Sequence, residues 1–403
     1  LVILNKYVNG ENMKKIILLF VTFITFISNT YGLDINSKNA VMYNLNDNTV
    51  VFEKNKDQET SIASLTKIMT VLVAIENISD YDKNVTITSN MLSGLREQNL
   101  AVVGLKENQN VTYNDLLYAA FLASGADAVR GLTYSISGNE EDFVKLMNEK
   151  AQQLNLKNTV FENPIGLDDE KQHSTVDEVA ILLNEAMKNE KFKEIFFSKS
   201  YTFKDKSKTV YSTVFSIANS IDSSVNYILG GKTGFTYGAG RCLASIALDE
   251  NNNIKYLLVT TNADINGSNH VKDAINIYNY YFQNYKYQEI IKKDDTLVEL
   301  KIKNDPKTVK KIKAKEPILL YLPNDYDKNE IKINYNGIEK LNYGMKKDTK
   351  IGYIDISYKN KIYIKVDVVL DEDVNFSLIN FIKNNIITIS IFIIILLFVI
   401  KMY

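Results

Sequence analysis

The sequence has few of the residues from which disulfides and metal sites are built. Its 403 residues include one cysteine, two histidines and no tryptophan. The single cysteine, Cys242, excludes an internal disulfide framework, and two histidines argue against a zinc cluster. We therefore expect neither a metal nor another cofactor.

The chain also lacks an excess of charge of either sign. It carries 47 basic and 48 acidic side chains, which gives a net charge of −1. Nucleic-acid binding needs a basic footprint, so we expect no nucleic-acid partner. Hydrophobic residues make up 45% of the chain, which is enough for packed cores, and the length suits two or three domains.

The beginning of the chain is typical of an exported protein. Residues 13–32 combine two lysines, an apolar run over residues 16–27 and a short stretch of mostly small, uncharged residues. This order predicts a secretory signal peptide that is cleaved after Gly32. We interpret Met13 as the true start and residues 1–12 as an upstream extension.

The end of the chain holds a second apolar run. Residues 384–400 are 17 uncharged residues (400 − 384 + 1) between Lys383 and Lys401. A buried helix is the alternative, but the terminal position favours a transmembrane anchor. The two ends together predict a protein held by the cytoplasmic membrane on its extracytoplasmic face, with the tail inside.

Two patterns divide the chain between these ends. Over residues 33–285, short strands alternate with amphipathic helices, which predicts an α/β (α+β) domain. Over residues 286–375, apolar and charged residues alternate with period two, which predicts a small all-β domain. In the first region we expect a hairpin over 41–52, helices over 65–78, 113–122, 141–154 and 269–285, and strands over 225–229, 242–248 and 254–260.

A serine and a lysine one helical turn apart form the first motif with chemical meaning. Ser64 and Lys67 open the most apolar helix of the region, and their spacing puts both side chains on one face. A lysine serves as a base for a serine nucleophile when burial or a nearby cation disfavours its charge. On its own the pair is weak, because a cap residue with a surface lysine produces the same pattern.

A glycine-rich segment after an apolar strand forms the second motif. In residues 230–235, Gly-Gly-Lys-Thr-Gly-Phe, the glycines allow close backbone approach to a ligand and Lys232 supplies a positive charge. A plain turn is one alternative. A phosphate-binding loop is another, but Asn226 stands where that loop needs glycine.

Together the two motifs resemble those of penicillin-recognising serine enzymes. The surrounding residues, 63–70, 161–168 and 231–243, narrow the resemblance to the low-molecular-mass penicillin-binding proteins, the serine D-alanyl-D-alanine carboxypeptidases. The resemblance covers residues 33–285. It implies a β-lactamase/transpeptidase-like catalytic domain, with an antiparallel sheet flanked by helices and a helical subdomain, and it agrees with the β-rich region and the terminal anchor.

The middle motif of that family, Ser-x-Asn, departs from the expected pattern. Residues 137–139 match it literally, but the family places it about sixty residues after the nucleophile, at the end of an apolar helix. Ser124-Gly125-Ala126 stands there (124 − 64 = 60). We therefore interpret Ser124 as the functional serine and Ala126 as a replacement of the usual amide, which lowers activity without abolishing it.

The resemblance implies acyl transfer. Lys67, uncharged, takes the proton of Ser64, which attacks the carbonyl between the two terminal D-alanines of a peptidoglycan stem peptide. Ser124 passes the proton to the leaving D-Ala, and water releases the acyl-enzyme. β-Lactam antibiotics are expected to acylate Ser64 in the same geometry.

The resemblance also implies a substrate site on the second motif. Lys232 and Thr233 hold the terminal carboxylate, and Gly234 lets the strand approach the nucleophile. The backbone N–H groups of Ser64 and Phe235 form the oxyanion hole.

Two alternatives remain open. A class A β-lactamase shares both signatures, although we find no Glu-x-x-Leu-Asn deacylating glutamate. The second alternative is a catalytically weak, membrane-tethered protein that binds penicillin or peptidoglycan, and it is suggested by the missing amide at Ala126. Six further residues are interpreted as structural or left undecided: His173, His270, Cys242, Asp127 and Asp177 as structural, and Arg241 as either charged support or surface.

Overall fold

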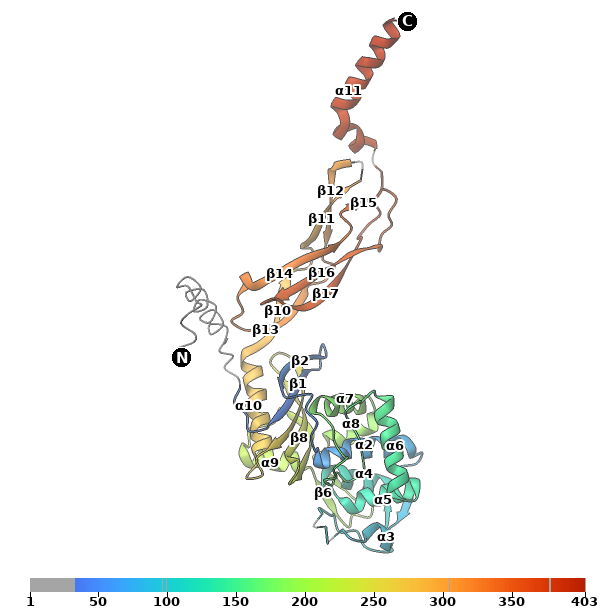
Figure 1. The fold of residues 1–403 in the computed structure, drawn as a ribbon, viewed down its shortest axis with the longest axis vertical. Coiled ribbons are helices and arrows are strands. Elements are labelled where there is room, and N and C mark those ends of the chain that lie inside the picture. Colours follow the sequence, from blue (N-terminus) through green and yellow to red (C-terminus); the bar gives the residue numbers. More distant parts are fainter. Residues whose placement is uncertain (1–32, 96, 99, 304, 377, 403) are drawn as a thin grey trace, which may run out of the picture. The chain divides into compact units, whose positions relative to one another are not determined.

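The computed structural model describes residues 33–402 except 96, 99, 304 and 377 (Figure 1). The predicted signal peptide over residues 13–32 lies outside the described residues, as does the upstream extension. The chain divides into two compact units, the first ending at Asn279 and the second beginning at Tyr280.

A five-stranded antiparallel sheet organises the first unit. Its strand order is β2-β1-β9-β8-β7, so the early hairpin pairs directly with a strand more than 200 residues later in the chain. The register joins Val41 to Val259, and β7 forms the edge of the sheet. The strands are β1 (Asn39–Asn44), β2 (Thr49–Lys54), β7 (Ile228–Thr236), β8 (Gly240–Asp249) and β9 (Ile254–Ala263).

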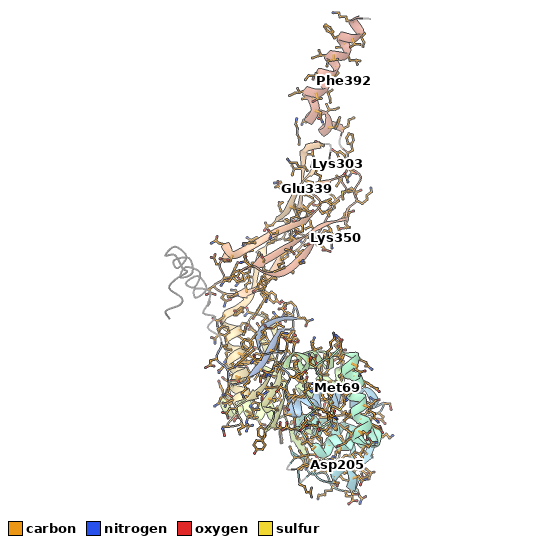
Figure 2. The ribbon with its side chains drawn as sticks, in the orientation of Figure 1. Met69, Asp205, Lys303, Glu339, Lys350 and Phe392 are labelled. Carbon is orange, nitrogen blue, oxygen red and sulfur yellow. The ribbon has the colours of Figure 1, made fainter. Side chains whose placement is uncertain are left out.

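Helices cover both faces of this sheet (Figure 1). On one face lies α10 (Asn269–Asn284), where Tyr278 OH donates to Ser245 O of β8. On the other face a helical group surrounds α2 (Lys67–Asn77), which is buried over most of its length because its residues are apolar all round. Met69 of α2 lies fully buried within this group (Figure 2). The other helices of the first unit are α3 (Ser89–Leu92), α4 (Tyr113–Leu122), α5 (Ala126–Ser137), α6 (Glu140–Gln153), α7 (Val176–Ala186), α8 (Glu190–Phe197) and α9 (Thr213–Ile221), with short hairpins β3 (Asn84–Thr86)/β4 (Asn110–Thr112) and β5 (Ser200–Thr202)/β6 (Thr209–Tyr211).

Most of the predicted elements appear with small shifts, but two differ in a way that matters for the site. The strand predicted over 225–229 begins at Ile228 and continues to Thr236, because β8 pairs with it along this whole length. The helix predicted from residue 65 begins at Lys67. The residues before it form a 3-10 turn, η2 (Ala63–Thr66), so Ser64 lies in the turn.

The second unit is built from β-strands after the end of α10. Alternating apolar residues such as Leu300, Ile302 and Ile354 face a common core, as period-two patterning requires. The strands form three sheets, in the orders β10-β13, β12-β11-β15 and β14-β16-β17. Their bounds are β10 (Tyr285–Ile291), β11 (Thr296–Ile302), β12 (Asp305–Lys313), β13 (Ile318–Pro323), β14 (Ile331–Gly337), β15 (Lys340–Leu341), β16 (Lys350–Tyr358) and β17 (Lys361–Val369), with a 3-10 turn η3 (Lys328–Glu330).

The transmembrane anchor predicted over residues 384–400 was wrong. These residues belong to α11 (Leu378–Met402), and among the described residues no helix combines the length and apolar character that crossing a membrane requires. The predicted location on the extracytoplasmic face of the cytoplasmic membrane rested on this anchor and is corrected with it.

Candidate active site

The predicted nucleophile and base lie next to each other at the start of α2. Lys67 Nζ is 3.0 Å from Ser64 Oγ and donates a 2.6 Å hydrogen bond to the carbonyl oxygen of Ile165. Ser64 follows Ala63, whose φ of +46° is unusual for a residue with a side chain. The tight turn brings the serine hydroxyl over the first residue of the helix.

Two more predicted residues extend this pair into a continuous array. Ser124 Oγ donates to Ser64 Oγ at 3.0 Å, and Lys232 Nζ donates to Ser124 Oγ at 3.1 Å. Ser124 has a φ of +60° in the turn between α4 and α5, while Lys232 stands on β7. Residues 64, 67, 124 and 232 are thus brought together from a 3-10 turn, a helix, a helix–helix turn and a sheet edge.

Burial shifts both lysines of the array toward the neutral form. Each has 1% of its surface exposed. The pKa of Lys67 is lowered well below its ordinary value, mainly by burial and further by the positive charge of Lys232. Burial also lowers the pKa of Lys232, to about 7. An uncharged Lys67 beside a serine hydroxyl is able to accept its proton.

The array opens into a cavity of about 330 Å³. Besides Ser64, Lys67 and Ser124, its wall includes Arg241 and His270, and none of its lining residues carries a carboxylate. In the described part of the chain, no group of His, Cys, Asp or Glu side chains is arranged to hold a metal ion. The cavity is therefore suited to an anionic ligand.

Edge strand β7 forms the wall nearest the nucleophile. A Cβ atom on Gly234 would lie 3.0 Å from the backbone nitrogen of Ser64 and 3.1 Å from Ala63 Cβ, so only glycine allows this approach. Phe235, the next residue, keeps 43% of its surface exposed. The guanidinium carbon of Arg241 lies over its ring, 5.3 Å from the ring centroid. Thr233, Gly234 and Phe235 all line the cavity.

Comparison with known proteins identifies this arrangement. The peptidase S11 family, described as D-alanyl-D-alanine carboxypeptidase, matches residues 26–264, more than half of the chain. The chain belongs to this family. Residues 285–375 match the C-terminal domain of penicillin-binding protein 5. The predicted family, serine peptidase class and β-lactamase-like fold with an all-β second part are confirmed.

Individual relatives agree with the family match. D-alanyl-D-alanine carboxypeptidase DacF of Bacillus subtilis is 25% identical over 339 residues, which cover 84% of this chain and 85% of that protein. DacA of Haemophilus influenzae is 32% identical over 224 residues, about half of each protein.

Solved structures show the same fold. Penicillin-binding protein 5 from Haemophilus influenzae has a TM-score of 0.64 at 25% identity and covers 84% of this chain and 98% of its own. The Streptomyces K15 DD-transpeptidase has a TM-score of 0.55 at 26% identity and covers 62% of this chain and 98% of its own.

The structure places the serine chosen by spacing at the cavity, and not the literal Ser-x-Asn match at residues 137–139. Ser124 and Ala126 line the cavity, and Ala126 is 1% exposed. In the literal match, Gly138 ends α5 and Asn139 caps α6, its Oδ1 accepting from the backbone nitrogen of Asp142. Among the described residues, the side chain of Lys67 is held by a backbone carbonyl and the nucleophile, not by an amide.

Sequence reasoning missed two contributors to the site. Thr213, the first residue of α9, places Oγ1 2.7 Å from Thr233 Oγ1 and lines the cavity. Ile165 contributes its carbonyl oxygen to Lys67. Thr213 is an ordinary threonine without a motif around it. Ile165 lies in the segment 161–168 that carries the resemblance, but it acts through its backbone, so its side chain gave no sign of this role.

The residues interpreted as structural or left undecided fall into two groups. Arg241 and His270 line the cavity; burial and nearby Arg241 lower the pKa of His270 to about 4. Cys242 is buried in β8, and His173 Nδ1 lies 2.7 Å from the carbonyl oxygen of Lys171. Of these, only Arg241 and His270 are in reach of a ligand in the cavity.

Proposed function

We propose that this member of the carboxypeptidase family removes the terminal D-Ala from peptidoglycan stem pentapeptides through an acyl-enzyme on Ser64. The observation that supports it best is the array from Lys67 through Ser64 and Ser124 to Lys232, with each link at 3.0–3.1 Å. We assign the catalytic domain to residues 33–285 and the β-rich domain to residues 286–375.

Acylation begins with attack by Ser64 Oγ on the carbonyl carbon of the penultimate D-Ala. The hydroxyl proton moves to the uncharged Nζ of Lys67, and a tetrahedral oxyanion forms. The backbone N–H groups of Ser64 and Phe235 are the proposed donors to that oxyanion. The close packing of Gly234 against the Ser64 nitrogen supports this, because it brings β7 beside the nucleophile.

The intermediate then collapses, and the bond between the carbonyl carbon and the leaving nitrogen breaks. Ser124 relays the proton that Lys67 accepted from Ser64 to the leaving amine. Lys232 and Thr233 hold the carboxylate of the departing D-Ala; binding that anion favours the charged form of Lys232, whose pKa is about 7 in the free site. Water hydrolyses the ester and restores Ser64.

We propose the same serine as the target of β-lactam antibiotics. The amide bond of a β-lactam occupies the position of the scissile peptide, and its carboxylate occupies the position of the terminal carboxylate. We further propose that residues 13–32 direct export as a signal peptide, which N-terminal sequencing of the secreted protein tests.

D-alanine release from a muramyl pentapeptide tests the proposal directly. The wild-type protein is expected to release D-Ala and to gain the mass of one penicillin, whereas Ser64→Ala does neither. Ser137→Ala, in the literal Ser-x-Asn match, is the matched control and retains both activities. Equal D-Ala release by Ser64→Ala and wild type contradicts the proposal.

The second candidate is a penicillin-binding protein with little turnover. The observation that favours it is Ala126, which places a methyl group in the cavity where the family has an amide. Penicillin labelling of Ser64 without D-Ala release would support this candidate. Rapid turnover of nitrocefin without a stable adduct would instead support a β-lactamase.

A further inference from the structure

An apolar strap forms the part of the cavity wall next to the Ser124 turn. We define the strap as residues 100–105, Leu-Ala-Val-Val-Gly-Leu, which have no regular secondary structure. Leu100 and Ala101 line the cavity, and Val102 keeps 43% of its surface exposed. A segment without a helix or strand of its own needs outside contacts to hold its position.

A buried carboxylate supplies those contacts. Asp127, 1% exposed in the first turn of α5, accepts hydrogen bonds from three consecutive strap nitrogens, at 3.0 Å from Val103, 2.8 Å from Gly104 and 2.9 Å from Leu105. Its Oδ1 also accepts from the backbone nitrogen of Ala128 at 3.0 Å. Both carboxylate oxygens therefore accept two N–H groups each.

The turn directly before Asp127, residues 124–126, carries Ser124 of the catalytic array and also contacts the strap. The backbone nitrogen of Ala126 donates to the carbonyl oxygen of Ala101 at 2.8 Å. A Cβ atom on Gly125 would lie 3.0 Å from both Asp127 Oδ1 and Val103 Cγ1, so no side chain separates the strap from this turn. The strap and Ser124 thus share one rigid attachment.

The polarity of the cavity wall indicates which part of a substrate faces the strap. The charged Arg241 stands on β8, whereas the strap residues at the cavity, Leu100 and Ala101, are apolar. Lys232 and Thr233, the proposed carboxylate site, stand on β7. An extended peptide with its terminal carboxylate at that site directs its other end away from it.

We infer that the strap binds the stem peptide on the N-terminal side of the scissile bond, and that Asp127 is the positioning residue that holds the strap in place. This inference rests on the proposed function and assigns a second part of the substrate to the same site. Asp127 acts through the strap and touches no reacting atom.

Asp127→Asn tests the inference with two substrates of different length. Whichever way the amide rotates, its NH₂ group faces two backbone N–H donors, so the strap loses half of its acceptors while the side-chain volume stays the same. The quantity measured is the ratio of kcat/KM for a stem pentapeptide to kcat/KM for N-acetyl-D-Ala-D-Ala. We expect this ratio to fall at least fivefold, through a higher KM for the pentapeptide.

Asp115→Asn is the matched control. Asp115 is 2% exposed, and its carboxylate accepts from the nitrogens of Thr112 and Lys204 and from Tyr201 OH. It does not line the cavity, so its variant is expected to lower the melting temperature without changing the substrate ratio.

The outcomes separate the inference from the proposed function. If Asp127→Asn leaves the ratio of the two kcat/KM values unchanged, whether or not both reactions become slower, the strap does not bind the stem peptide. If the wild type releases no D-Ala and penicillin does not acylate Ser64, the proposed function fails instead. The melting temperature of each variant shows that the proteins compared are folded.

Discussion

The cavities of the two units have opposite characters. Around the first, two lysines are buried at 1% exposure, and Ala63 and Ser124 adopt positive φ angles beside the nucleophile. Such conformations cost of order 1–3 kcal/mol each and persist only where the surrounding packing holds them. Buried ionisable side chains and backbone strain thus occur together at the proposed reaction centre.

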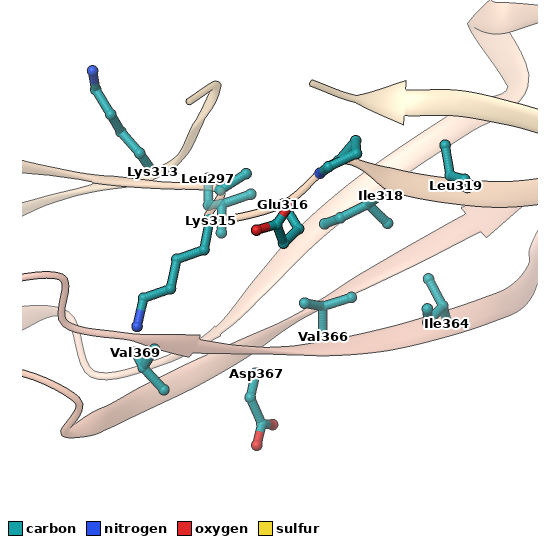
Figure 3. Close-up of a pocket in the computed structure, with 12 residues that line it drawn as sticks. Leu297, Lys313, Lys315, Glu316, Ile318, Leu319, Ile364, Val366, Asp367 and Val369 are labelled. Carbon is teal, nitrogen blue, oxygen red and sulfur yellow. The ribbon is translucent and has the colours of Figure 1, made fainter. Parts of the chain in front are cut away.

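The cavity of the second unit lies between β-strands (Figure 3). Two of its charged residues form ion pairs with residues outside the wall: Lys315 with Asp348 at 2.9 Å, and Asp367 with Lys350 at 2.7 Å. Positive φ angles in this unit fall in turns such as residues 359–360. The wall contains no serine, histidine or cysteine. The presence of a cavity alone therefore does not indicate a reaction centre, whereas buried ionisable side chains together with backbone strain do.

The largest expected effect comes from removing the proposed base. Lys67→Met leaves a side chain of similar length without an amine, and we expect acylation of Ser64 by labelled penicillin to slow by at least about 10³-fold. Lys150→Met, which removes a lysine paired with Glu76 on another helix, is the control and keeps the wild-type rate. If penicillin acylates Ser64 in Lys67→Met at the wild-type rate, Lys67 is not the base, and its burial does not set the first cavity apart from the second.

A smaller change is expected from restoring the amide. Ala126→Asn places a hydrogen-bonding group in the cavity that Ala126 lines, within the segment that holds Ser124. A hydrogen bond to a charged group contributes about 1.5–3 kcal/mol, so we expect D-Ala release to rise about tenfold or more. Unchanged turnover in a variant with the wild-type melting temperature would show that Ala126 does not limit the reaction.

The buried lysines also predict how stability depends on pH. The pKa of Lys232 is about 7 in the folded protein and about 10.4 in an unfolded chain, so between these values the unfolded chain binds a proton that the folded protein does not. Stability therefore rises with pH across this window: the destabilisation caused by burying Lys232 is fully present below about pH 7 and is gone above about pH 10.4.

Lys232→Met removes the side chain that binds a proton in the unfolded chain but not in the folded protein. The slope of unfolding free energy against pH is expected to fall by up to about 1.4 kcal/mol per pH unit between pH 7.5 and 9.5, measured by urea unfolding. Parallel curves for wild type and Lys232→Met would show that Lys232 is not neutral in the folded protein.

The smallest effect on activity is expected from the second unit. Ile354, fully buried in β16, stabilises the core of that unit, and Ile354→Ala is expected to cost about 2–5 kcal/mol there. Penicillin acylation at a temperature where both units are folded stays within twofold of wild type. Ile362→Ala, at a position 52% exposed, is the control with little effect on stability. A matching loss of acylation in Ile354→Ala would mean that the second unit supports the site.

Literal motifs predicted Ser64, Lys67 and Lys232, but family spacing was the better guide to Ser124. Ser124 was chosen because the resembled family places its middle motif about sixty residues after the nucleophile, at the end of an apolar helix. The literal match at residues 137–139 ends one helix and caps the next. The C-terminal run shows the limit: it was predicted as a transmembrane anchor, but among the described residues no helix is long and apolar enough to cross a membrane.

The sequence by itself determined the residue types of the chemistry, the period of the β-rich region and the one-turn spacing of Ser64 and Lys67. Only the tertiary structure decided that a carbonyl of residue 165 holds Lys67, that Thr213 meets Thr233, and that Asp127 supports the strap. These contacts join segments 20 to 98 residues apart, and two of the three use backbone groups, the carbonyl of Ile165 and the N–H groups of the strap. A pattern of side chains contains no record of such pairings, because packing of the whole unit selects them.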